Sequence, residues 1–117
     1  MPSKAKQLVQ RFSELHEATE HLRAVLLRYD KASDKLAILV ADGADLATAL
    51  ENLAGPVRRS QVTDAVDEFE AARHRVRLAM FALAKEQGSS LSEMGRALGI
   101  SRQLASRLAA ESEETSG

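Results

Sequence analysis

Hydrophobic residues recur every seven positions along the first third of the chain. The main row consists of Leu8, Leu15, Leu22, Tyr29 and Leu36, the second of Ala18, Val25, Ala32 and Leu39, and Phe12, Leu26 and Val40 widen the stripe. Neither Gly nor Pro interrupts residues 4–41. This spacing is typical of coiled coils and long bundle helices, and it predicts one helix from Lys4 to about Ala41.

A helix with such a stripe cannot bury it alone, so the pattern also predicts a partner. We expect a homodimer held by this helix, with contacts through Leu8, Leu15, Leu22, Val25, Tyr29 and Leu36. The alternative, that the stripe packs within one chain, stays open at this stage.

Two more helices are predicted before the C-terminal region. Gly43 ends the first helix, Asp45 caps a short one carrying Leu46, Leu50 and Leu53, and Gly55-Pro56 closes it. A third should run from Val57 or Ser60 to Gln87 and stop at Gly88. Its expected apolar face consists of Val62, Val66, Phe69, Val76, Met80 and Leu83. The predicted fold class is all-α.

Residues 91–108, LSEMGRALGISRQLASRL, have the spacing of a helix-turn-helix. Gly99 suits the left-handed residue that ends the first helix, and Gly95 removes a side chain where the two helices meet. Ser90 with Glu93 forms a capping box, and Ser101 caps the second helix. The inward positions are Met94, Leu98, Ile100, Ala105 and Leu108.

This segment resembles the helix-turn-helix of small bacterial transcription regulators, above all in its Gly-Ile-Ser-Arg-Gln run at 99–103. The resemblance covers about 20 residues, or about 30 with the preceding helix, and Ala105 departs from the larger β-branched residue common there. It implies that Ser101, Arg102, Gln103, Ser106 and Arg107 face the major groove. Their chemistry agrees, because Arg can bind guanine and Gln can bind adenine through two hydrogen bonds.

A second set of residues is better placed for the DNA backbone. Near the start of the first motif helix, amide donors and the helix dipole favour an anion. The predicted phosphate contacts are Lys85, Ser89, Ser90, Ser92 and Arg96.

Charge is unevenly distributed, although the net charge is only −1. Residues 1–72 hold nine Lys/Arg and twelve Asp/Glu, residues 73–110 hold seven and two, and three acids follow from Glu111. The basic stretch contains the motif, as expected for a segment that docks on phosphates. A helix whose charges match its dipole explains the bases at residues 73–85 equally well.

Several kinds of chemistry are not expected. The chain has no Cys, no apolar run long enough to cross a membrane and no Gly-rich phosphate loop. The segment from His16 to His21 approaches the zinc-protease pattern, but the residue four after His16 is Glu20, so a solvated helix face is expected. We expect no enzyme activity, metal or cofactor.

The sequence therefore predicts a sequence-specific transcription regulator that is located in the cytoplasm, at the nucleoid, and whose partners are double-stranded DNA and a second copy of the chain. Its expected parts are a dimerisation module (1–56), a tri-helical DNA-binding module (57–110) and an acidic disordered tail (111–117). Alternatives are a nucleoid, plasmid-partition or recombination accessory protein, or a helical adaptor for a partner such as a transcription-machinery protein.

Overall fold

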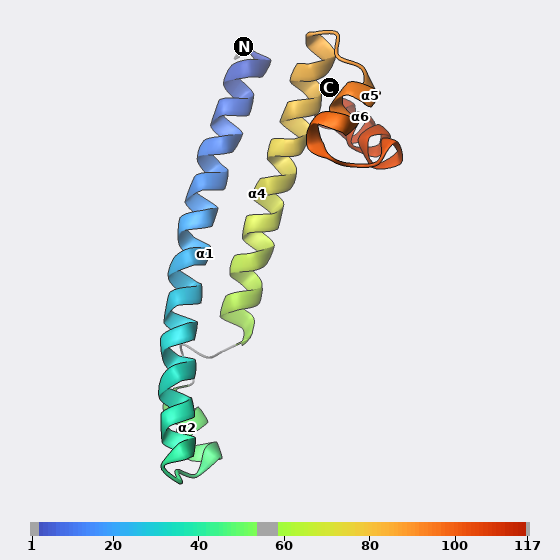
Figure 1. Cartoon of the computed structure of the whole chain (residues 1–117). Helices are drawn as coiled ribbons and strands as arrows, with labels where there is room; N and C mark the ends of the chain where they lie inside the picture. The colour runs from blue at the N-terminus through green and yellow to red at the C-terminus, as the bar shows by residue number, and fades with distance from the viewer. Residues whose placement is uncertain (1–2, 54–58, 117) are drawn as a thin grey trace. The chain divides into compact units, whose positions relative to one another are not determined.

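The computed structural model describes residues 3–53 and 59–116, and within them the chain is all-α (Figure 1). The helices are α1 (Lys4–Ala41), α2 (Leu46–Asn52), α4 (Arg59–Glu86), α5 (Leu91–Leu98) and α6 (Arg102–Ser116). The predicted fold class is confirmed, and the predicted helix ends lie within a residue or two of those observed except at the end of α6. Gly55-Pro56 and the expected boundary at residue 56 lie outside the described residues.

Local sequence signals account for the helix ends. Asp45 caps α2 by accepting a hydrogen bond from the Thr48 N–H, at 3.2 Å. α1, α4 and α5 each end at a glycine with positive φ: Gly43, Gly88 and Gly99. After each glycine the chain turns back so that the next N–H bonds a carbonyl five residues earlier, as in Ala44 to Leu39 and Ser89 to Ala84.

The chain divides into two compact units. We call His16–Glu70 the middle unit, and Met1–Leu15 with Ala71–Gly117 the terminal unit. α1 and α4 contribute to both units, and within each they are neighbours (Figure 1). The predicted modules are functional divisions and stay predictions.

The middle unit is built on small residues. Its buried side chains are Ala18, Val25 and Ala32 of α1, Ala49 of α2, Leu53 just after α2, and Ala65 of α4. Alanines let helix backbones approach closely, so this part of α1 packs within the chain. At its edge, His21 Nε2 lies 3.9 Å from Glu68 Oε2.

The terminal unit holds a hydrophobic core cluster. Phe81 of α4 is buried together with Ala105 and Leu108 of α6. Partly buried residues surround them: Leu78, Leu91, Met94, Leu98, Ile100, Leu104 and Ala109. The start of α1 joins this unit through Glu14, whose carboxylate lies 3.5 Å from Arg75 and 2.7 Å from Arg11.

The apolar face predicted for α4 was incomplete. It omitted Phe81 and Leu78, which pack in the core of the terminal unit, and it included Val66, which is exposed. The reason is that α4 contacts two different neighbours, α1 and the α5–α6 pair, on different sides. A single hydrophobic stripe describes only one of these contacts.

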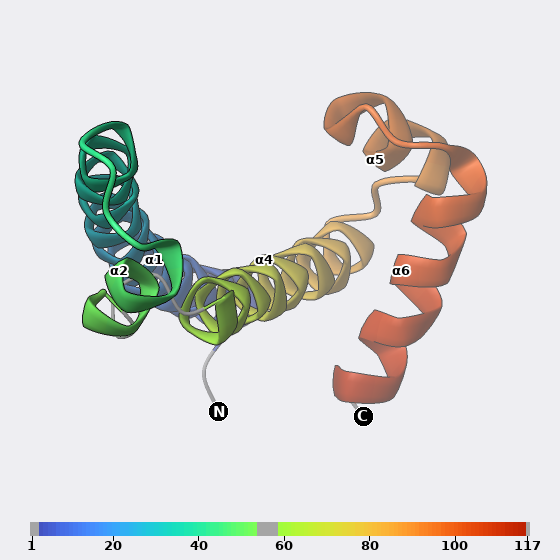
Figure 2. The same cartoon turned by 90° about the horizontal axis from the view of Figure 1, so that it is seen from below.

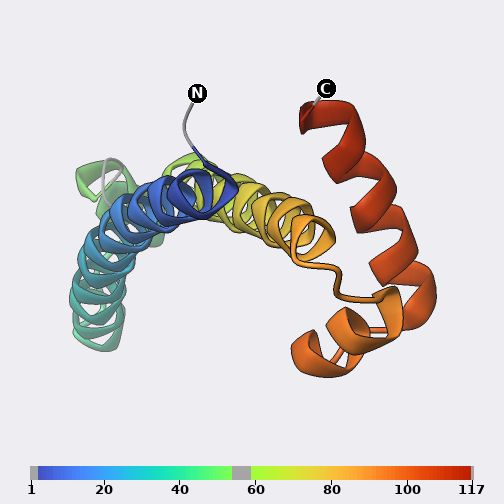
Figure 3. The same cartoon turned by 90° about the horizontal axis from the view of Figure 1, so that it is seen from above.

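The prediction of a disordered acidic tail was wrong for residues 111–116, because α6 continues without a break to Ser116 (Figure 3). Tertiary contacts hold these last turns. The Glu111 carboxylate contacts the His74 ring, Lys85 Nζ lies 2.5 Å from Glu113 Oε1, and Ser112 is buried. The Ser112 hydroxyl donates to the Ala109 carbonyl, at 2.7 Å, so its burial leaves no polar group unsatisfied.

Within residues 3–53 and 59–116, none of the helices combines the length and hydrophobicity needed to cross a bilayer.

Candidate DNA interface

The start of α5 is fixed by a reciprocal pair of hydrogen bonds. The Ser90 hydroxyl accepts from the Glu93 N–H, and the Ser90 N–H donates to Glu93 Oε1, both at 3.1 Å. This is the predicted capping box, and it is confirmed. The hydrogen bonds from the Ser90 backbone and hydroxyl, and then the nearby Arg96 guanidinium, hold the pKa of the Glu93 carboxyl below its ordinary value.

The turn between α5 and α6 depends on two glycines in different ways. Gly99 has φ 68° and ψ 33°, a left-handed conformation that a Cβ disfavours. At Gly95, a Cβ would lie 3.3 Å from the Ile100 carbonyl oxygen and 4.0 Å from Ala105 Cβ. Gly95 therefore allows the close approach of the turn and α6 to α5, as predicted.

α6 begins at Arg102, directly after its predicted N-cap Ser101. Ser101 Oγ accepts a hydrogen bond from the Leu104 N–H, at 3.1 Å. α5, the turn and α6 thus form a helix-turn-helix, which Figure 2 shows as two helices joined by a short connection.

Four of the five predicted base-reading residues lie on the exposed side of the first turns of α6, whereas Ser101 precedes α6 and its hydroxyl caps that helix. Ser101, Arg102, Gln103, Ser106 and Arg107 are all exposed, whereas Ala105 and Leu108 are buried. Within the described residues, the side chains of Arg102, Gln103, Ser106 and Arg107 form no hydrogen bond or ion pair with the protein. These donors are available to a ligand.

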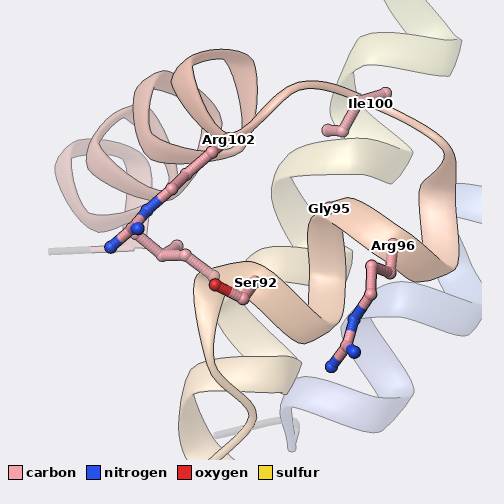
Figure 4. A pocket seen from close by; sticks show the side chains of 6 residues that line it. Ser92, Gly95, Arg96, Ile100 and Arg102 are labelled. Carbon is pink, nitrogen blue, oxygen red and sulfur yellow. The ribbon is translucent and has the colours of Figure 1, made fainter.

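An open hollow of about 370 Å³ lies beside this face, between α5 and the start of α6. Ser92 and Arg96 come from α5 and Arg102 from α6, and in the view of Figure 4 Ser92 lies between the two arginines. Leu91, Gly95 and Ile100 complete the lining. Two guanidinium groups and a hydroxyl suit a phosphate oxygen, because charge-assisted hydrogen bonds to anions are strong.

The other three predicted phosphate residues lie elsewhere. Lys85, Ser89 and Ser90 line a second hollow, of about 400 Å³, between the end of α4, the start of α5 and the end of α6. There Lys85 is already paired with Glu113. Sequence reasoning missed Glu113 because it treated the acidic segment as disordered.

The basic residues of α4 are largely engaged within the terminal unit. Arg75 contacts Glu14, the His74 ring contacts Glu111, and Arg73 also has an interaction partner. These contacts give Arg73, His74 and Arg75 partners within the terminal unit, and they do not distinguish dipole matching from DNA contact for the other bases at residues 73–85.

The residues predicted for dimerisation are not equally accessible. Val25 is buried inside the middle unit, and Leu8, Leu15, Leu22 and Leu36 are half-buried. Tyr29 is exposed. The heptad stripe is therefore used at least in part within one chain.

The histidines of α1 lie on a solvated face, as the heptad frame indicated. His16, Glu17, Glu20 and His21 are exposed, and Glu20 pairs with Arg23 at 3.1 Å. In the parts of the chain that the structure describes, no three His, Cys, Asp or Glu side chains gather closely enough to hold a metal ion.

Comparison with known protein families, curated proteins and solved structures finds no match to this chain.

Proposed function

We propose that this protein binds DNA sequence-specifically as a homodimer and regulates transcription on the nucleoid in the cytoplasm. The observation that carries the proposal is the outward face of α6, where Arg102, Gln103, Ser106 and Arg107 are exposed without partners in the described protein. A helix whose only role is packing does not require such a cluster of exposed hydrogen-bond donors.

The chemistry of this face matches base edges. An α-helix fits the major groove of B-DNA, where Arg can donate two hydrogen bonds to guanine and Gln can pair with adenine. Arg102 and Gln103 open the helix and should reach base edges first, with Ser106 and Arg107 about a turn further along. The adjacent hollow, with Ser92 and Arg96, supplies donors for the DNA backbone.

A dimer is part of the proposal for an energetic reason. One recognition helix makes too few contacts for useful specificity, whereas two read a pair of half-sites and add their binding energies.

The test compares Arg102→Ala and Arg96→Ala against a library of single-base variants of a selected DNA site. Arg102→Ala should cost about 1–3 kcal/mol and flatten the preference at one base pair per half-site. Arg96→Ala should weaken binding to all sequences alike and reduce the salt slope by about 1.

Arg28→Ala is the matched control, because it removes one exposed arginine from the middle unit. If Arg102→Ala lowers affinity uniformly and leaves every base preference intact, Arg102 contacts phosphate and the assignment of the reading face is wrong. Footprinting then separates regulator from architectural protein. A few protected sites support regulation, whereas continuous coating of DNA contradicts it.

A further inference from the structure

Three adjacent rows of residues on α1 differ in burial within the middle unit. In the inner row, Ala18, Val25 and Ala32 are at most 7% exposed. In the outer row, Leu26 is 45% and Val40 is 49% exposed. A middle row, Leu22, Tyr29 and Leu36, separates them and is half-buried except for Tyr29, which is 40% exposed.

The increase in exposure from the inner row to the outer row shows where the contact between α1 and the rest of the middle unit ends. Residues three and four apart are neighbours on a helix, so each row touches the next. The inner row is covered by the same chain, the middle row is covered on one side, and the outer row is the least covered, with Leu26 and Val40 exposed.

The middle and outer rows together have the spacing of a second seam. Positions 22, 26, 29, 33, 36 and 40 alternate steps of four and three, which is the pattern that lets two helices interlock side chains. Ser33, a half-buried polar residue, occupies one outer position, and the other outer and middle positions in this stretch are apolar or aromatic. α1 therefore carries two seams that share the middle row.

We propose that a second copy of this chain packs along this second seam, defined by Leu22, Leu26, Tyr29, Leu36 and Val40. The inner seam, which includes Val25, is already occupied within the chain. The inference refines the homodimer of the proposed function by assigning its surface, and it does not depend on DNA binding.

The occupant is another copy because the seam is complementary to itself. A helix that interlocks with a 3.5-residue repeat must carry the same repeat, and a two-fold dimer brings identical seams together. The row beside the outer row carries one charge of each sign, Arg23 and Asp30, and Arg23 also pairs with Glu20 of the same helix, so this edge is not dominated by like charges that would repel a second copy. On α2, Leu46 and Leu50 add exposed apolar surface to the same unit.

Leu26 and Leu27 provide a matched test. They are adjacent leucines with similar exposure, 45% and 55%, but Leu27 lies about 100° further round the helix and off the seam. Sedimentation of the full chain should show dimers for the wild type and Leu27→Asp. Leu26→Asp should raise the dimer dissociation constant by about tenfold or more.

Leu26→Ala and Leu27→Ala form a milder pair that keeps helix propensity high, in case the aspartates disturb folding. Helicity measured by circular dichroism should be the same in both alanine variants, with weaker dimerisation in Leu26→Ala only. A wild-type chain that stays monomeric at high micromolar concentration overturns the proposal, as does equal weakening by the two alanine substitutions. Sedimentation without DNA reports on this surface and a gel shift reports on DNA binding, so either proposal can fail alone.

Discussion

Lys85 Nζ at the end of α4 lies 2.5 Å from Glu113 Oε1 on α6. A second contact joins His74 to Glu111, also between these two helices. Glu111 and Glu113 are two residues apart on α6, whereas His74 and Lys85 are eleven residues apart on α4, about 16 Å along its axis. α6 therefore crosses α4 rather than running alongside it. The side chains of both pairs are about half exposed or more. Each ion pair therefore contributes little to the free energy of unfolding, and its main effect is on the local charge.

The first prediction is that Glu113→Gln strengthens DNA binding. It frees the Lys85 ammonium, which lines a hollow together with Ser89 and Ser90 and is a predicted phosphate contact. One additional phosphate contact should steepen the salt dependence of log K by about 0.9 per log unit of salt. Filter binding across a salt series measures this slope.

Glu114→Gln is the control, because it removes the same charge from an exposed neighbour that has no described partner. Equal effects of the two substitutions would mean that DNA binding responds only to the net charge and that the Lys85–Glu113 ion pair has no specific effect on it. Thermal unfolding should show little change in either variant, since exposed pairs contribute about 0–1 kcal/mol.

The second prediction concerns the turn. Gly99→Ala should lower the free energy of unfolding by about 1–2 kcal/mol, because an L-residue with a Cβ is strained at φ 68°. Apart from its two chain neighbours, no described residue has a heavy atom within 4 Å of the position of a Cβ at Gly99, so the cost comes from the backbone alone. Gly99→Asn should cost less, since Asn tolerates this conformation better. Urea unfolding of the three proteins tests the order, and an Ala variant as stable as the wild type would contradict the left-handed turn.

The third prediction is a pH dependence centred on Glu93. Its pKa in the folded protein lies below the ordinary 4.5, so ionisation of Glu93 favours the folded state. That contribution is complete above about pH 4.5 and is lost as the pH falls through the folded pKa. The melting temperature of Glu93→Gln should therefore fall below that of the wild type at pH 7, and the gap should close in acid.

Glu17→Gln provides the comparison, because Glu17 is exposed and has no described partner. It should show no comparable gap at either pH. A gap for Glu93→Gln that is unchanged down to pH 3 would show that the carboxylate charge does not stabilise the start of α5.

Features set by near neighbours in the sequence were predicted well. Ser90 and Glu93, the glycine at position 99 and the cap at Ser101 act through hydrogen bonds that span three to five residues. All the residues that form these hydrogen bonds lie within a short segment. The turn and the starts of both motif helices could therefore be placed without tertiary information.

Features set by distant segments were predicted poorly. The acidic residues after Ala110 look disordered on composition, yet they form the last turns of α6, where Ser112 is buried and Glu111 and Glu113 contact His74 and Lys85, 37 and 28 residues away. Phe81 was missed for the same reason, because its neighbours Ala105 and Leu108 lie in another helix. Hydrophobic periodicity describes a helix face but does not identify what covers it.

Anchoring at both ends has an entropic consequence for α6. Its start is fixed by the close approach of Gly95 to Ala105, and its end by buried Ser112 between Glu111 and Glu113. A ligand that meets the outer side chains of such a helix orders their rotamers but does not have to order the backbone that carries them. Recognition by Arg102, Gln103 and Arg107 would thus cost side-chain freedom and the general cost of association, but no ordering of the helix backbone.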